Sequence, residues 1–163
     1  MVLPKRFIFG LISLHLTMRG TAQNEGCVTA IGHACPFGWT QWTGKCYKAL
    51  NHQMTWFDAK VECDKMDSDL VVPQSKEETD FLLSMKYYFW INCNDLHTDG
   101  VWTCQEGSIE VEYRDWNQGE PNNLGQEEDC GSVWGNTKKW NDTPCSLDYS
   151  VICTRPAAPV LHF

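Results

Sequence analysis

The spacing of apolar residues predicts two amphipathic helices in the first half of the chain. The later of the two is expected to begin at Ser75, where Ser75-Lys76-Glu77-Glu78 has the capping-box pattern. It should end near Tyr87, with Phe81, Leu82 and Met85 buried. The first helix is expected from Thr55 to Met66, behind a threonine that can cap its first turn. Its apolar or small stripe consists of Trp56, Ala59, Val61 and Cys63.

Beyond Tyr88 the pattern changes to short β-type runs separated by Gly, Asn, Asp and Pro. Residues 117–143 form a polar segment between these runs, and loops longer than about 12–15 residues are usually functional or disordered. Four tryptophans between residues 102 and 140 favour an ordered loop. Two helices followed by short strands predict an α+β domain. The runs expected to form strands are Phe89-Trp90-Ile91, Gly100-Val101-Trp102-Thr103 and Tyr149-Ser150-Val151-Ile152.

Residues 1–22 have the order of a secretory signal peptide. A charged start at Lys5-Arg6 is followed by an apolar run from Phe7 to Met18 and by the small residues Gly20-Thr21-Ala22. The run is shorter than the roughly 20 residues that a membrane span needs, so we expect cleavage after Ala22 and no membrane anchor. The remainder of the 163 residues suffices for one domain in a secreted, extracellular protein.

The charge of the expected mature chain argues against a nucleic-acid partner. Removal of residues 1–22 takes away three basic residues and no acidic one, which leaves ten basic residues against 21 acidic. Nucleic acid binds through basic surfaces, which this composition does not favour. The acidic excess is explained by solubility alone or by clusters of acids that bind calcium, and the positions of the acids must decide.

Nine cysteines follow residue 22 and favour an oxidising compartment. They include no Cys-x-x-Cys pair and no nearby pair of histidines, so disulfides are a better interpretation than a zinc site. Spacing does not give the connectivity, and the odd number leaves at least one thiol without a partner in the chain.

Acidic and amide residues are concentrated at three places in the long polar loop. Calcium binds six to eight oxygens from carboxylates, amides, backbone carbonyls and water, and these clusters supply such oxygens with few competing nitrogen or sulfur ligands. Asn and Asp also form ordinary turns, so one cluster alone would carry little weight. The clusters are Glu120-Pro121-Asn122, Glu127-Glu128-Asp129 and Trp140-Asn141-Asp142.

These clusters, with Trp90-Ile91 and cysteines 63, 130, 145 and 153, resemble the C-type lectin-like domain over about residues 35–155. The segment from Cys35-Pro36 to Cys46-Tyr47 is similar to the extra N-terminal hairpin of the family's long form. In this interpretation residues 23–34 are an N-terminal segment and residues 156–163 a C-terminal tail. The resemblance implies two helices, short antiparallel sheets and a long calcium-binding loop, linked by the disulfides Cys35–Cys46, Cys63–Cys153 and Cys130–Cys145.

The same resemblance implies a principal calcium ion that also binds sugar. Glu-Pro-Asn accompanies mannose, fucose and N-acetylglucosamine in this family, whereas Gln-Pro-Asp accompanies galactose, so glycans of the mannose type are the expected partners. Innate immune recognition or agglutination would be a corresponding role. Pro121 would follow a cis peptide bond, which costs little only before proline. The implied calcium and sugar ligands are Glu120, Asn122, Glu128, Asn141 and Asp142.

An auxiliary calcium ion is suggested by a second group of residues, in which Asn123 stands where the family often has an acid. That replacement should weaken the binding of the ion. The alternative for Asp95 and Asp99 is that they are solvated loop acids. The group consists of Asp95, Asp99, Asn123, Glu128 and Asp129.

Two cysteines depart from the family pattern. Cys93 and Cys104 replace residues of other types, which suggests a bridge if their segments are neighbouring strands, with two buried free thiols as the alternative. Cys27 would then remain for a disulfide-linked homodimer or for a bond to another thiol. Asn141-Asp142-Thr143 fits the N-glycosylation pattern, but the calcium role excludes a glycan there.

Enzymatic activity is not expected, because the five histidines form no evident constellation with a serine or cysteine. The remaining alternative is a role other than sugar binding on the same scaffold, such as binding to ice, mineral or protein surfaces, since fold does not fix function.

Overall fold

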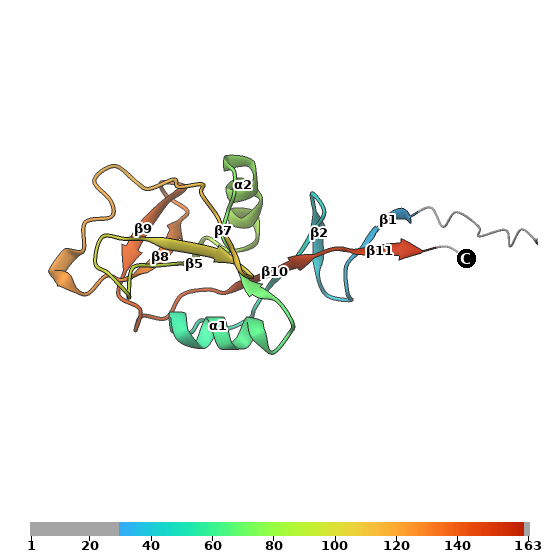
Figure 1. Cartoon of the computed structure of the whole chain (residues 1–163), viewed down its shortest axis with the longest axis horizontal. Helices are drawn as coiled ribbons and strands as arrows, with labels where there is room; N and C mark the ends of the chain where they lie inside the picture. The colour runs from blue at the N-terminus through green and yellow to red at the C-terminus, as the bar shows by residue number, and fades with distance from the viewer. Residues whose placement is uncertain (1–29, 162–163) are drawn as a thin grey trace, which may run out of the picture.

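The computed structural model describes residues 30–161, with two helices on opposite sides of a group of antiparallel strands (Figure 1). Helix α1 spans Trp56–Asp64, α2 spans Lys76–Met85, and a short 3-10 turn, η1, spans Leu124–Gln126. The first strands are β1 (Ala30–Ala34), β2 (Thr40–Trp42), β3 (Lys45–Ala49), β4 (Asp69–Leu70), β5 (Tyr88–Asn94) and β6 (Thr103–Glu106). The others are β7 (Ile109–Glu110), β8 (Cys130–Trp134), β9 (Lys139–Thr143), β10 (Ile152–Pro156) and β11 (Ala158–Leu161).

Both predicted helices begin where their caps were expected. The Thr55 side chain accepts a hydrogen bond from the Asp58 backbone amide, and Ser75 accepts one from Glu78. The stripe of the first helix was predicted wrongly at Val61, which is 52% exposed, whereas its other members, Trp56, Ala59 and Cys63, are buried as predicted. The stripe of α2 was correct, since Leu82 is buried and Phe81 and Met85 pack against the same core.

The strands form a five-stranded sheet in the order β7-β6-β5-β8-β9 and a four-stranded sheet in the order β2-β3-β10-β4. The run predicted at Phe89 falls within β5, the nearly buried middle strand of the larger sheet. Two strands were predicted to begin earlier in the sequence than they do. Regular pairing starts only at Thr103 in β6 and at Ile152 in β10, where the partner strands β5 and β3 lie in register.

Four disulfides connect these elements, with the pairs that the resemblance and the paired cysteine changes implied. Cys63–Cys153 joins α1 to β10, and Cys35–Cys46 links the segment before β2 to β3. Cys93 and Cys104 stand directly opposite each other on β5 and β6, with Cα atoms 4.1 Å apart, and both are fully buried. Cys130–Cys145 connects β8 to the segment that follows β9.

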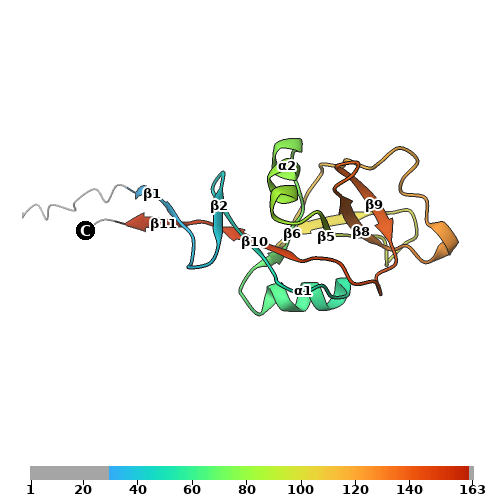
Figure 2. The same ribbon diagram turned by 180° about the vertical axis from the view of Figure 1, so that it is seen from behind.

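Strands β1 and β11 pair with each other in an antiparallel ribbon that the sequence did not predict. Residues 30–34 and 158–161 had been assigned to a terminal segment and a tail. Figures 1 and 2 show the ribbon at one end of the long axis and η1 at the other. The predicted signal peptide and Cys27 lie outside the described residues, and none of the described helices is long and apolar enough to cross a membrane.

Candidate calcium and sugar site

The long polar loop is fastened to β9 at its beginning and to β8 at its end. The Asn117 backbone amide donates to the Trp140 carbonyl at 2.8 Å, and the Trp140 amide donates to the Asp115 carbonyl at 2.9 Å. At the far end, the Cys130–Cys145 disulfide fixes the first residue of β8. These attachments place the Glu120-Pro121-Asn122 segment next to β9, with a cis bond before Pro121.

Strand β9 carries two more of the predicted ligands, Asn141 and Asp142. It pairs with β8 so that Asn141 lies opposite Ser132 and Asp142 opposite Gly131. Trp140 is buried in the main core, Asn141 is partly exposed, and Asp142 is fully buried. An aspartate without exposed surface needs donors or a cation as partners, because burial of an unpaired carboxylate is costly.

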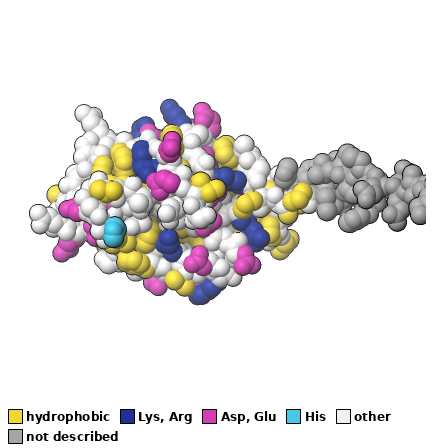
Figure 3. Space-filling view, viewed as in Figure 1, with side chains coloured by type: hydrophobic (Ala, Val, Ile, Leu, Met, Phe, Trp, Pro, Cys, Tyr) yellow, Lys and Arg dark blue, Asp and Glu magenta, His cyan; other side chains and the backbone are white. Residues whose placement is uncertain are grey.

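Residues of the loop and of β9 line a common cavity of about 480 Å³. Four of the five predicted principal ligands line it, and the fifth, Asp142, lies next to Glu120. Figure 3 shows acidic side chains at the end of the molecule that carries η1 as well as over the rest of the visible face. The lining ligands are Glu120, Asn122, Glu128 and Asn141.

Two buried carboxylate oxygens in this place, Glu120 Oε2 and Asp142 Oδ1, have no hydrogen-bond partner. Ionised carboxylates only accept hydrogen bonds, so two of them beside each other need a proton or a cation between them. A proton shared by the two carboxylates would not require the nearby asparagine amide oxygens, whereas a calcium ion coordinates such oxygens. The donor set therefore fits calcium.

Burial, followed by the neighbouring Asp142 carboxylate, raises the pKa of Glu120 to about 7. Burial also raises the pKa of Glu128, while a hydrogen bond from the Leu124 backbone amide opposes this increase. Without a cation, the folded loop thus stabilises the protonated form of Glu120 near neutral pH.

Backbone amides already hold part of the carboxylate set. The Asn123 amide donates to Asp142 Oδ2 at 2.6 Å, and the Leu124 amide donates to Glu128 Oε2 at 2.8 Å. Among residues 30–161, no three carboxylate, histidine or cysteine side chains are grouped closely enough to form a metal cage by themselves. The amide oxygens of Asn122 and Asn141 would therefore be necessary parts of a calcium site.

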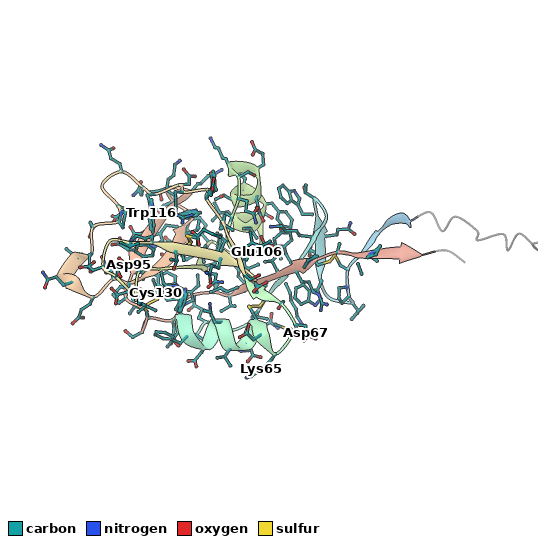
Figure 4. All side chains as sticks on the ribbon, viewed as in Figure 1. Lys65, Asp67, Asp95, Glu106, Trp116 and Cys130 are labelled. Atoms are coloured by element: carbon teal, nitrogen blue, oxygen red, sulfur yellow. A yellow bond between two sulfur atoms is a disulfide. The ribbon has the colours of Figure 1, made fainter. Side chains whose placement is uncertain are left out.

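The structure also brings together the residues suggested for an auxiliary ion. Asp95 is buried, its Oδ2 accepts from the Gly100 amide at 2.8 Å, and its Oδ1 has no partner. Burial raises the pKa of Asp95, and the nearby Asp129 and Asp99 carboxylates add to this. Figure 4 shows Asp95 on the same half of the molecule as Cys130.

Asn123 changes the character of this second group. Its amide nitrogen donates to Asp99 Oδ1 at 2.8 Å, and its amide oxygen accepts from the Glu128 backbone amide at 3.1 Å. A carboxylate could not donate to Asp99, so the amide satisfies an oxygen that would otherwise be available to a cation. This contact gives a physical basis for the expectation that Asn123 weakens an auxiliary calcium site.

Sequence reasoning missed the apolar side of the cavity. Trp134, Leu147 and Tyr149 line it together with the ligands, although they come from β8 and from the segment before β10. Trp134 had been noted only as part of an ordered loop. Strand β8 is buried from Cys130 to Val133 and partly exposed only at Trp134, so no alternation in its sequence indicated this position.

The chain belongs to the C-type lectin family. The profile of the Lectin C-type domain matches residues 52–155, inside the boundaries expected from the sequence. Among curated relatives, the CD209 antigen of Homo sapiens is 39% identical over 132 residues, which cover 77% of this chain and 32% of that protein. This chain thus spans about a third of the length of such relatives.

Solved structures with the same fold include a carbohydrate-recognition domain and an antifreeze protein. The carbohydrate-recognition domain of cow CD23, determined in the presence of a GlcNAc2Man3 oligosaccharide, is 32% identical with a TM-score of 0.71, covering 78% of this chain and 99% of that one. A calcium-independent type II antifreeze protein is 26% identical with a TM-score of 0.73, covering 79% and 99%. Members of the family are generally binding proteins without enzymatic activity, but the fold alone does not select the ligand.

Proposed function

We propose that this protein is a secreted lectin that binds glycans of the mannose type in a calcium-dependent manner. The observation that carries the proposal is the pair of buried, unpartnered oxygens of Glu120 and Asp142 beside the amide groups of Asn122 and Asn141. Solvated loop acids would not leave such oxygens buried without a donor. Glu120, Asn122, Glu128, Asn141 and Asp142 would hold the ion.

Glu120 and Asn122 would also select the sugar. Bound calcium supplies coordination for two neighbouring hydroxyl groups. The Glu120 carboxylate accepts a hydrogen bond from one hydroxyl and the Asn122 amide donates to the other. This order of acceptor and donor differs from Gln-Pro-Asp, and it supports mannose, fucose or N-acetylglucosamine over galactose.

Chelator elution from immobilised mannan tests the proposal. We expect the protein to be retained in millimolar calcium, eluted by excess chelator and eluted by free mannose but not by galactose. Retention that persists in chelator would instead favour a calcium-independent function, and one structural neighbour is a calcium-independent antifreeze protein. No retention in calcium would also contradict the proposal.

Acidification is expected to weaken calcium binding below about pH 7. Ordinary carboxyl groups would place this loss near pH 4, but the raised pKa of Glu120 makes protons compete with calcium much earlier. Calorimetric calcium titrations at pH 8, 7, 6 and 5 and constant ionic strength should show progressively lower affinity. Equal affinities at pH 8 and pH 5 would contradict this expectation.

In the metal-free protein, acidification is expected to have the opposite effect: it should stabilise the fold. The pKa of Glu120 is higher in the folded state than in the unfolded state. This group therefore stabilises the fold fully below about pH 4.5 and loses that contribution as the pH rises through about 7. Metal-free wild type should therefore lose more stability between pH 5 and pH 8 than Glu120→Gln. Urea denaturation of both proteins measures the difference.

Covalent dimerisation through Cys27 is a further expectation, since the other eight cysteines are bonded in pairs. Two linked sites can raise the apparent affinity for a glycan surface by about 10²–10⁴ without a new contact. Cys27→Ser should halve the mass on a non-reducing gel and reduce agglutination, while the affinity per site for free mannose stays the same. A wild-type protein that migrates as a monomer without reductant would exclude the covalent dimer.

A further inference from the structure

A groove of about 690 Å³ runs along residues 109–113, away from the candidate calcium and sugar site. None of the described residues that line it also lines the cavity beside β9. Residues of three strands of the four-stranded sheet line the groove as well, namely Lys45 of β3, Asp69 of β4 and Pro156 of β10. The groove therefore lies where the edge of the five-stranded sheet meets the four-stranded sheet.

The five-stranded sheet is open along this groove. Strand β7 is its last strand and pairs only with β6. The Val111 backbone amide donates to the Cys104 carbonyl of β6 at 2.8 Å. Backbone groups of successive residues point to opposite sides of a strand, so the N–H and C=O of the preceding residue, Glu110, are directed away from β6. The backbone of Glu112 makes no hydrogen bond within the described part of the chain. Open groups of this kind can pair with an added strand.

The side chains along the open edge alternate between apolar and acidic. Residues 109–113 read Ile-Glu-Val-Glu-Tyr. Ile109 is 72% exposed, and Glu110 and Glu112 are exposed as well. Residues that stand opposite each other on neighbouring strands stabilise the pair when their charges are opposite and destabilise it when the charges are alike. The strand that complements this edge therefore alternates between apolar and basic residues.

The charge of the whole groove favours the same partner. Four carboxylates and one cation line it. The cation, Lys45, is ion-paired with Glu106 at 2.6 Å, and Asp69 and Glu112 have no ionic partner among residues 30–161. The surplus carboxylates attract a cation most strongly where they are partly shielded from water, as Asp69 is. The four carboxylates are Asp69, Glu106, Glu110 and Glu112.

Charge also disfavours the other occupants of an open strand edge. A second copy of this chain, paired through β7, would bring glutamates together with glutamates. Nucleic acids and anionic membranes carry negative charge, which the carboxylates of the groove would repel. A basic peptide has neither disadvantage.

We propose that the groove binds an extended basic peptide of a partner protein, which adds to β7 as a further strand. The peptide backbone pairs with Glu110 and Glu112, its apolar side chains cover Ile109 and Tyr113, and its lysine or arginine side chains contact the carboxylates. Because no residue is shared with the cavity beside β9, the protein would hold a glycan and a protein partner at the same time.

NMR titration of the isotope-labelled protein with acetyl-Val-Lys-Val-Lys-Val-amide tests the proposal. We expect saturable shifts of the backbone amide resonances of Glu110 and Glu112, with a dissociation constant of about 1 mM or lower. The affinity should be the same in calcium and in excess chelator. The acidic analogue acetyl-Val-Glu-Val-Glu-Val-amide should bind at least about tenfold more weakly. No shift of either resonance, or equal affinity for the two peptides, would overturn the inference.

Two N-methylated forms of the basic peptide distinguish strand addition from simple attraction of an amine. One form carries methyl groups on both lysine amides and the other on the central and last valine amides, so each lacks the N–H donors of one peptide edge. Only one edge pairs with β7, and we expect one form to lose at least about tenfold in affinity. Undiminished binding by both forms, or the same shifts with n-hexylamine alone, would contradict strand addition.

Two variants locate the peptide in the groove. Glu112→Gln and Asp69→Asn each remove a carboxylate without an ionic partner, and each should weaken binding of the basic peptide about threefold at low salt. Asp148→Asn is the matched control, since it removes an exposed carboxylate outside the groove and should leave the affinity unchanged. If Glu112→Gln and Asp69→Asn bind the peptide as tightly as Asp148→Asn does, the peptide lies elsewhere and the inference is wrong.

Discussion

Replacement of Asn141 by alanine is expected to abolish calcium-dependent retention on mannan. The variant removes an amide oxygen from a set that, by its carboxylates alone, is not grouped closely enough to hold a metal. It also removes a contact to the sugar in the proposed function. We expect the affinity for free mannose to fall by at least about 100-fold, or roughly 2.7 kcal/mol.

The fold of Asn141→Ala should remain intact. The Asn141 side chain is partly exposed, and its amide nitrogen contacts the backbone carbonyl of the next residue, Asp142. Strand β9 stays paired with β8 through backbone groups. Asn136→Ala, in the exposed β8–β9 turn, is the matched control and should bind mannan as wild type does. Normal sugar binding by Asn141→Ala would refute the assignment of the site.

Removal of the Cys63–Cys153 disulfide should cause the largest loss of stability. The two residues are 90 positions apart, and the chain-entropy estimate for a loop of that length is about 4–5 kcal/mol. Both residues are fully buried between α1 and β10. Cys63→Ala with Cys153→Ala should therefore lower the free energy of unfolding by about 4 kcal/mol in urea denaturation.

The Cys35–Cys46 pair serves as a comparison because it spans only 11 positions. Its removal releases a much shorter closed loop in the unfolded chain and should cost about 2–3 kcal/mol. A smaller loss for the Cys63–Cys153 variant than for the Cys35–Cys46 variant would show that loop entropy does not govern these bonds. Both variants should be compared in excess chelator, so that metal binding contributes to neither free energy of unfolding.

The sequence predicted the helices well because their starts depend on local chemistry. Thr55 and Ser75 satisfy backbone amides within their own first turns, so their effect can be predicted without the rest of the fold. The limits of β6 and β10 depend on their pairing with other strands, β5 and β3, and there the prediction was shifted. Val61 was misplaced because α1 is apolar on both sides, with Phe57 exposed as well.

The candidate site was predicted as a set of residues but not as a set of interactions. The motif placed Glu120 and Asn141 in one site, and the structure brings both to one cavity. The unpartnered oxygen of Glu120, its raised pKa and the donation by Asn123 to Asp99 depend on side chains from separate segments. No local pattern contains that information, and the same holds for Trp134, Leu147 and Tyr149 on the apolar side of the cavity.

The position of the β1–β11 ribbon determines how the molecule can be attached to a surface. Residues 30 and 161 pair with each other at the end of the long axis opposite η1, as Figures 1 and 2 show. A biotin or a surface linker attached beyond either residue would therefore leave the cavity facing away from a sensor chip. Immobilisation from the two sides should give the same glycan response, whereas random coupling through lysines would not.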